Sequence, residues 1–396
     1  MKTRLVYAVG CLLLVACPRG SASADGTSSG HPPGQGSGGP TAAQQAAVTV
    51  AKAACDARHA DGCVSLAMLY EEGTGVTKDL ARAVALYVQA CDLGQVSGCT
   101  AAASMYDHGR GVPRDATRSS VLYEEGCNKG SAQDCDTAGF FHWKGDGVPK
   151  DFVRASVLYK RGCDGGALHG CFNLGVLYDD GTGVAKDPAH AHALYQQACD
   201  GNIAEGCFGL GLDFANGDSV PKDFAKAITF YTKACDSDFG SGCNNVGLLY
   251  ERGNGATKDY AKAFALYTKA CDDEEYLGCE NAGRMYEEGR GVTADQTKAF
   301  ALYKKACDAS PPSGCTELGE AYADGRSVPV DLAKAVAFFK DACKQGDDDG
   351  CSALGLVAEK GLGGAPADRA KALDLYRKGC KAGGHWFCAQ VKRLGG

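Results

Sequence analysis

The sequence predicts an all-α solenoid built from helix pairs that repeat every 36 residues. Two observations carry this prediction. Two cysteines eight residues apart recur with that period from Cys55 to Cys351, and they return at Cys380 after one inserted residue near Gly363–Gly364. Within each period, apolar residues fall at helical spacing in two segments. Because a fixed period of about 20 to 50 residues is typical of solenoids, the 396-residue chain needs no single large core.

The N-terminus predicts export from the cytoplasm. Lys2 and Arg4 form a positive start, and a short apolar run from Leu5 to Ala16 follows, as in a signal peptide. That run meets Leu14-Val15-Ala16-Cys17, which resembles a bacterial lipobox. We therefore expect residues 1–16 to be a signal peptide and Cys17 to carry a lipid in the cell envelope. The alternative is a secreted or periplasmic protein cleaved near Ala24.

Residues 17–40 are expected to be a tether. The stretch from Ser21 to Pro40 is rich in Gly, Ser and Pro and has almost nothing to bury. A flexible linker of this length has a root-mean-square reach of roughly 25 Å. Such a tether would hold a folded domain, residues 41–396, away from the membrane to which the lipid anchors the protein.

Each repeat predicts two antiparallel helices. In the first repeat, Leu66, Leu69 and Tyr70 have helical spacing, and Gly73 is the usual left-handed helix end. After a glycine-rich loop, Asp79 is expected to cap a second helix. Nine such pairs follow one another, and half-units at Thr41 to Ala54 and Ala389 to Leu394 are expected to close the stack.

Two further positions that recur in every repeat predict how the helices pack. A small residue recurs in the first helix and an aromatic residue recurs in the second, which lets the helices approach while a ring fills the gap. The small residues are Ala67, Ala103, Gly139, Gly175, Gly211, Gly247, Gly283, Gly319 and Gly355. The aromatic residues are Tyr87, Tyr123, Tyr159, Tyr195, Tyr231, Tyr267, Tyr303, Phe339 and Tyr376.

The cysteine pairs are expected to be disulfides. On one helix, residues eight apart would be about 12 Å apart, whereas bridged cysteines need Cα atoms within about 7 Å. A turn must therefore separate them, and residues such as Asp92, Gly94 and Gly98 supply one. The expected bridges are Cys55/Cys63, Cys91/Cys99, Cys127/Cys135, Cys163/Cys171, Cys199/Cys207, Cys235/Cys243, Cys271/Cys279, Cys307/Cys315, Cys343/Cys351 and Cys380/Cys388.

Metal binding is the competing interpretation of the cysteines. Zinc sites usually bring two ligands about two to four residues apart, and the repeat cysteines contain no such step. The histidines are scattered, with His190 and His192 the closest pair. We expect no metal and no cofactor, and so many cysteines then indicate an oxidising compartment.

Composition argues against other classes of function. The net charge is −7 and no block of lysine or arginine stands out, whereas nucleic-acid binding needs a concentrated basic face. No stretch reaches the roughly 18 apolar residues that span a bilayer. The expected contact with a membrane is therefore the lipid anchor, and no nucleic-acid partner is expected.

The repeat resembles the Sel-like repeat family, a relative of the tetratricopeptide repeats. The pattern stands clearly at Leu174-Gly175, at Gly181 to Asp187, and at Lys262-Ala263 through Cys271. The cysteine step of eight resembles the cysteine-rich branch known from Helicobacter secreted proteins. The resemblance implies an α/α superhelix whose first helices line a concave surface that binds peptides or proteins. Members of that branch have also been described as penicillin-binding proteins with weak β-lactamase activity.

For binding, three asparagines are candidates. Asn173, Asn245 and Asn281 occupy equivalent places in the first helices and resemble those that hold peptide backbone or terminal carboxylates in tetratricopeptide grooves. The alternative is that each bonds locally or to water. Phe172, Phe208 and the run Phe140 to Trp143 could add an aromatic anchor, although some of these rings must pack in the core.

For hydrolysis, the sequence offers little. Ser219-Val220-Pro221-Lys222 matches the Ser-x-x-Lys motif of serine β-lactamases, but the partner motifs are absent. The equivalent loop of another repeat begins with Gly147, so Ser219 resembles a substitution of that glycine rather than a placed nucleophile. We therefore assign no catalytic residue. The expectation is a protein- or peptide-binding scaffold, with a hydrolase or binder of β-lactams or cell-wall peptides as the alternative.

Overall fold

The computed structural model of the protein describes residues 40–309, 312–363, 366–381 and 385–395. These residues form twenty α-helices, and no strand occurs among them. The chain divides into two compact units, of which unit 1 ends at Gly206 and unit 2 begins at Cys207. The all-α repeat fold is confirmed. The signal peptide, Cys17 and the tether up to residue 39 lie outside the described residues.

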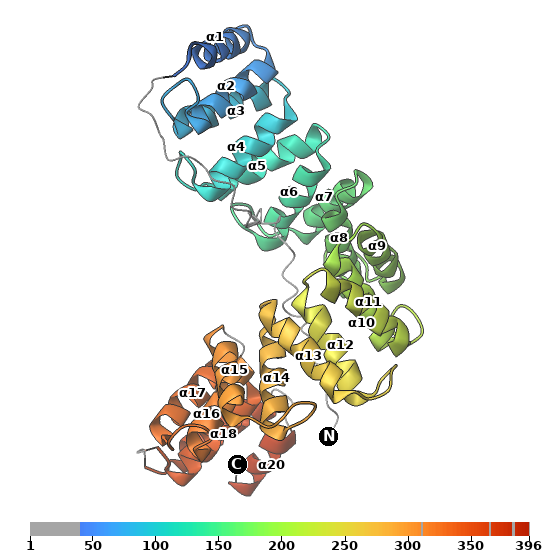
Figure 1. Ribbon diagram of the computed structural model, residues 1–396, viewed down its shortest axis with the longest axis vertical. Helices are drawn as coiled ribbons and strands as arrows, with labels where there is room; N and C mark the ends of the chain where they lie inside the picture. The colour runs from blue at the N-terminus through green and yellow to red at the C-terminus, as the bar shows by residue number, and fades with distance from the viewer. Residues whose placement is uncertain (1–39, 310–311, 364–365, 382–384, 396) are drawn as a thin grey trace. The chain divides into compact units, whose positions relative to one another are not determined.

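The helices have nearly uniform length (Figure 1). In unit 1 they are α1 (Ala42–Asp56), α2 (Ala60–Glu72), α3 (Leu80–Asp92), α4 (Val96–His108), α5 (Ala116–Asn128), α6 (Ala132–Lys144), α7 (Phe152–Asp164), α8 (Leu168–Asp180) and α9 (Pro188–Asp200). The unit boundary falls within α10 (Ala204–Asn216). In unit 2 they are α11 (Phe224–Asp236), α12 (Gly240–Arg252), α13 (Tyr260–Asp272), α14 (Tyr276–Glu288), α15 (Gln296–Asp308), α16 (Pro312–Asp324), α17 (Leu332–Lys344), α18 (Asp348–Lys360), α19 (Arg369–Lys381) and α20 (His385–Arg393).

The helix ends are set by the residues that the sequence singles out. Gly73 closes α2 with a φ of 81°, a left-handed conformation that favours glycine. Asp79 opens α3, because its carboxylate accepts a hydrogen bond of 2.9 Å from the backbone N–H of Arg82. The same pairing of a glycine end and an aspartate cap recurs at Gly253 and Asp259.

Within a helix pair, glycine lets a tyrosine ring enter the interface. A Cβ atom on Gly247 would lie 2.7 Å from Cε1 of Tyr267, and the Tyr267 side chain is fully buried. The glycine at position 247 is therefore a packing feature, as expected, since a side chain there would collide with the Tyr267 ring.

The predicted disulfides are present wherever the bridges are described. Their Cα atoms are 4.4 to 4.7 Å apart in Cys55–Cys63, Cys91–Cys99, Cys127–Cys135, Cys163–Cys171, Cys235–Cys243, Cys271–Cys279, Cys307–Cys315, Cys343–Cys351 and Cys380–Cys388. Cys199 and Cys207 are disulfide-bonded as well. The turn between two bridged cysteines uses a residue with positive φ, such as Gly94 at 99°. Asp92 and Gly98, by contrast, lie inside α3 and α4.

The even-numbered helices form one layer within each unit. In unit 2, α12 packs against α14, α14 against α16 and α16 against α18, and in unit 1 α6 packs against α8. We call the exposed side of this layer the inner face. None of the twenty described helices is long and apolar enough to cross a lipid bilayer.

Candidate peptide-binding groove

A groove of about 220 Å³ lies on the inner face of unit 2. It is formed by α14, α16 and α18, together with the residue that caps α18. Its lining consists of five carboxylates, three hydroxyl side chains and two apolar side chains: Glu280, Glu317, Glu320, Asp347, Asp349, Ser313, Thr316, Ser352, Ala353 and Leu356. The groove is therefore strongly acidic along most of its wall.

The repeat explains why these side chains meet. Glu280, Thr316 and Ser352 occupy the same place, one residue after the second cysteine of three successive pairs. Glu320 and Leu356 share another place, four residues further along their helices. Because successive even-numbered helices stack with the same orientation, equal places in the repeat lie side by side along the inner face.

Several groove residues are held by hydrogen bonds to one another. Thr316 Oγ1 donates to Asp347 Oδ2 over 2.6 Å, and the backbone N–H of Gly350 donates to the same oxygen over 2.7 Å. Asp347 thus caps α18 while it faces α16. Ser313 Oγ donates to Glu280. These bonds fix one wall of the groove before any ligand arrives.

The carboxylates that line the groove have few cationic partners. Burial, together with the neighbouring carboxylates of Glu320 and Glu280, raises the pKa of Glu317 to about 7. Arg326 opposes this shift, but its guanidinium pairs with Glu287, Glu320 and Asp324. Burial also raises the pKa of Glu280. An ammonium or guanidinium group placed in the groove would relieve this repulsion.

Asn281, one of the predicted binding residues, lies beside this groove but is only 9% exposed. Its Nδ2 donates to Asn244 Oδ1 over 2.8 Å, which joins α14 to α12. Its Oδ1 accepts from Arg284 Nη2 over 2.8 Å. Both ends of the amide are therefore used within unit 2.

Asn173 has the same place in unit 1 and a different environment. It is 1% exposed, and its Nδ2 donates to Asp136 Oδ1 over 2.9 Å, which joins α8 to α6. Its Oδ1 has no hydrogen-bond partner, since Val176 stands where Arg284 stands in unit 2. Burial raises the pKa of Asp136 to about 6. Asn245 on α12 is half-buried. A binding role for the three asparagines stays a prediction.

The structure also places the aromatic candidates. Phe172 and Phe208 are buried and pack against Tyr195 and Tyr231. Phe140 and Trp143 are half-buried on α6 and stack on each other with ring centroids 5.8 Å apart. The run from Phe140 to Trp143 therefore keeps a partly exposed aromatic pair on unit 1, whereas Phe172 and Phe208 belong to the core.

The Ser219 motif lies in the loop between α10 and α11. Ser219 Oγ is buried without a hydrogen-bond partner among the described residues. The Lys222 ammonium lies 4.6 Å from the centroid of the Phe224 ring. The geometry thus shows no Ser–Lys hydrogen bond of the kind that activates a nucleophile.

One cluster of potential metal ligands occurs among the described residues. It comprises Cys91, Cys99 and Glu125, whose ligand atoms all lie within 4.8 Å of one another. The two sulfurs are bonded to each other in a disulfide, so they are not thiolates that could hold an ion.

The groove acids were missed at the sequence level. The signal that could have found them is the repeat itself: Glu317 stands where Asn245 and Asn281 stand, and Glu280 stands where Asn244 stands. Aligning the repeats would have shown that charge replaces a neutral residue at Glu280 and Glu317, although not that the two side chains share a groove.

Comparison with known proteins places the repeat in a family. The Sel1 repeat model matches residues 60–95, 96–131, 138–166, 168–203, 204–239, 240–274, 277–311, 312–347 and 348–384. None of the curated proteins compared with the chain matches it.

Two solved structures agree on the fold, and a third is similar in sequence over part of the chain. A protective antigen of uropathogenic Escherichia coli with an SLR fold is 21% identical, with a TM-score of 0.58 over 87% of this chain and 81% of that one. A Sel1 repeat protein from Oxalobacter formigenes is 29% identical, with a TM-score of 0.55 over 58% of this chain and 94% of that one. Helicobacter pylori cysteine rich protein B is 32% identical over 33% of this chain and 93% of that one, with a TM-score of 0.28. The nine matched repeats confirm the resemblance seen in the sequence, and the chain belongs to the Sel1 repeat family.

Proposed function

We propose that this chain is a lipid-anchored scaffold of a bacterial cell envelope that binds a protein segment bearing lysine or arginine side chains. The observation that carries the binding proposal is the groove on unit 2, where the carboxylates of Glu280, Glu317, Glu320, Asp347 and Asp349 line one cavity of about 220 Å³. Sel1 repeat proteins generally mediate protein–protein interactions, which supports the scaffold class.

The chemistry of the groove selects the partner. Carboxylates attract an ammonium or guanidinium group, and charge-assisted hydrogen bonds of this kind are among the stronger ones. Leu356 and Ala353 supply an apolar strip along which the methylene stem of a lysine or arginine could lie. An acidic segment would meet like charges and be rejected.

The disulfides support a preformed surface. In the chain-entropy account, closing a loop of eight residues contributes about 2.5 kcal/mol per bridge. A rigid groove loses less conformational entropy when a partner binds, which favours affinity. The bridges also indicate an oxidising compartment outside the cytoplasm.

Titration calorimetry tests the binding proposal. A lysine-rich peptide and a glutamate-rich peptide of equal length would be titrated into the protein at pH 8. We expect binding of the basic peptide only, and Glu317→Gln should weaken it about tenfold, which corresponds to about 1.4 kcal/mol. The matched control is Asp236→Asn, an exposed acid of unit 2 outside the groove. Equal binding of both peptides, or equal effects of the two variants, would contradict the proposal.

The anchor is tested separately by fractionation. The proposal is that residues 1–16 are a signal peptide, that Cys17 bears the lipid and that residues 17–40 are the tether. The protein should then sediment with membranes. The Cys17→Ser variant should appear in the soluble envelope fraction. Soluble wild-type protein would favour the alternative of cleavage near Ala24.

A further inference from the structure

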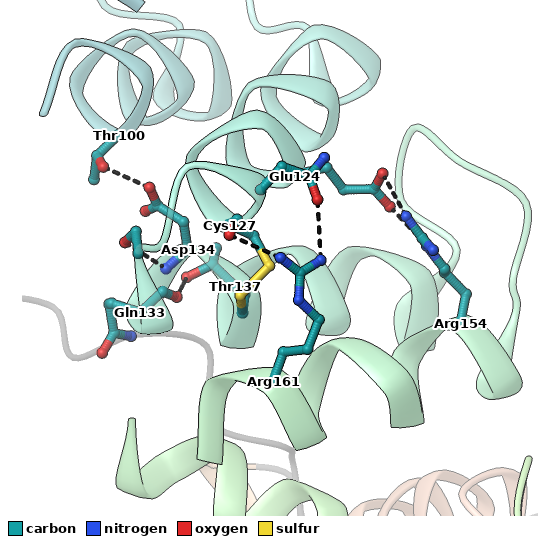
Figure 2. Close-up of a disulfide and its surroundings, with 11 residues drawn as sticks. Thr100, Glu124, Cys127, Gln133, Asp134, Thr137, Arg154 and Arg161 are labelled. Carbon is teal, nitrogen blue, oxygen red and sulfur yellow. Dashed lines mark hydrogen bonds and ion pairs between the residues drawn. A yellow bond between two sulfur atoms is a disulfide. The ribbon is translucent and has the colours of Figure 1, made fainter. Parts of the chain in front are cut away.

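Bridges in both units are covered by a polar side chain from the next helix pair. In unit 1, Arg161 Nη2 donates to the carbonyl oxygen of Cys127, one half of the Cys127–Cys135 bridge, over 3.0 Å (Figure 2). Gln197 Oε1 lies 3.7 Å from Cys163 Sγ. In unit 2, Lys305 Nζ donates to the carbonyl oxygen of Cys271 over 2.9 Å. Each covering residue follows its cysteine by 34 residues.

The covered bridges are buried on both sides. Cys127 and Cys135 are 1% and 3% exposed, and Cys271 and Cys279 are 1% and 0% exposed. A reductant can reach such sulfurs only after the local structure opens, which makes reduction slow in the folded protein.

The Cys343–Cys351 bridge lacks this cover. One inserted residue places Lys378 at the equivalent position, but its ammonium pairs with Asp374 Oδ2 over 2.9 Å. The Lys378 side chain is 69% exposed. Cys343 and Cys351 are both half-buried. The residues between the two cysteines are all described, so this exposure belongs to a defined turn between α17 and α18.

We infer that Cys343–Cys351 is a thiol–disulfide exchange site that a dithiol reductant opens while the rest of unit 2 stays folded. A thiolate of the dithiol attacks one sulfur of the bridge, forms a mixed disulfide and expels the other cysteine as a thiolate. The second thiol of the reductant, after losing its proton, attacks the mixed disulfide and releases the first cysteine. Two electrons pass to the protein, which gains two thiols, and the dithiol becomes a disulfide.

The position of the bridge gives exchange a consequence, which rests on the proposed function. Cys343 and Cys351 enclose Asp347 and Asp349, and Cys351 directly precedes Ser352. All three are groove residues. Opening the bridge frees the turn that positions Asp347 against Thr316, so reduction should weaken binding of a basic segment. Exchange at the bridge itself does not depend on whether the groove binds anything.

The exchange site is tested by timed alkylation of the native, full-length protein. Dithiothreitol is added, samples are quenched with iodoacetamide, and each cysteine is quantified by mass spectrometry while circular dichroism follows helix content. We expect Cys343 and Cys351 to be alkylated about tenfold or more faster than Cys271 and Cys279, with helix content unchanged. Equal rates for the two bridges, or labelling of Cys343 only as helix content falls, would overturn the inference.

A matched variant tests the cause. Lys305→Ala removes the cover from Cys271–Cys279 and should bring its alkylation rate toward that of Cys343–Cys351, while Cys127–Cys135 stays slow. An unchanged rate at Cys271 would overturn the shielding argument. Titration with the lysine-rich peptide before and after reduction measures binding separately from alkylation. If the groove does not bind the peptide, the titration shows no binding while Cys343 and Cys351 are still alkylated fast. If the exchange site is wrong, the alkylation rates are equal whatever the titration shows.

Discussion

Asn173 in unit 1 and Asn281 in unit 2 occupy the same place in their repeats, and they teach how the two inner faces differ. Asn281 bonds a neutral amide and the guanidinium of Arg284, so each polar atom has a partner. Asn173 bonds a buried carboxylate, Asp136, and keeps an unsatisfied oxygen. Unit 1 therefore holds charge inside its inner layer, whereas unit 2 displays charge in a groove.

Two tyrosines between the layers, Tyr267 and Tyr159, differ in a similar way. Tyr267 in unit 2 donates to Glu251 Oε2 over 2.6 Å. Tyr159 in unit 1 is fully buried and its hydroxyl has no partner, because Trp143 stands where Glu251 stands. The repeat fixes the ring in both units, but the residue that receives the hydroxyl varies from repeat to repeat.

The largest expected effect separates the two asparagines by pH. Asn173→Leu leaves Asp136, which is 2% exposed, without a hydrogen bond, and should cost about 3 kcal/mol of unfolding free energy at pH 8. Because burial raises the pKa of Asp136 from 3.8 to about 6, the carboxyl is neutral at pH 5 and the cost should shrink there. Asn281→Leu exposes no buried charge, so its cost should be about 1–2 kcal/mol at either pH. Urea denaturation at both pH values measures this, and a pH-independent loss for Asn173→Leu would contradict it.

The next effect compares the two tyrosines. Tyr267→Phe loses a hydrogen bond to a carboxylate and should destabilise the protein by about 2 kcal/mol. Tyr159→Phe removes a buried hydroxyl that has no partner and should stabilise it by about 1 kcal/mol. Thermal denaturation of the pair provides the check, and a shift of the same sign in both variants would show that the hydroxyl environments are alike.

A smaller effect concerns the acid in the groove of unit 2. Burial raises the pKa of Glu317 from 4.5 to about 7, so its charge opposes folding. The stability that the neutral form provides is present below about pH 4.5 and is lost as pH rises through 7. Glu317→Gln should therefore stabilise the protein at pH 8 by about 1 kcal/mol, allowing for solvent screening of a half-buried group. No change is expected at pH 4, and equal melting shifts at the two pH values would count against this assignment.

The smallest effect would make unit 1 resemble unit 2. Val176→Arg places a guanidinium three residues after Asn173, as Arg284 is placed after Asn281. The open Asn173 oxygen should then gain a donor, and the free energy of unfolding should rise by about 0.5–1 kcal/mol. Val176→Lys, with a different donor geometry, is the control. Destabilisation by both variants would mean that the site in unit 1 is closed to cations.

The sequence predicts the framework well because the framework is periodic. The spacing of Cys91 and Cys99, the glycine at Gly73 and the cap at Asp79 each depend on local backbone geometry that recurs in each repeat. The groove could not be predicted in the same way. The acidity around Glu317 comes from carboxylates on three helices, and only packing shows that they share one cavity. Likewise, only the packing of α8 on α6 shows that Asn173 meets the carboxylate of Asp136.

Amide hydrogen exchange with and without a lysine-rich peptide tests most directly whether the groove of unit 2 is the binding surface. The proposal predicts added protection in α14, α16 and α18 at pH 8, and none in α6 and α8. Protection confined to α6 and α8, or no protection anywhere at saturating peptide, would contradict it.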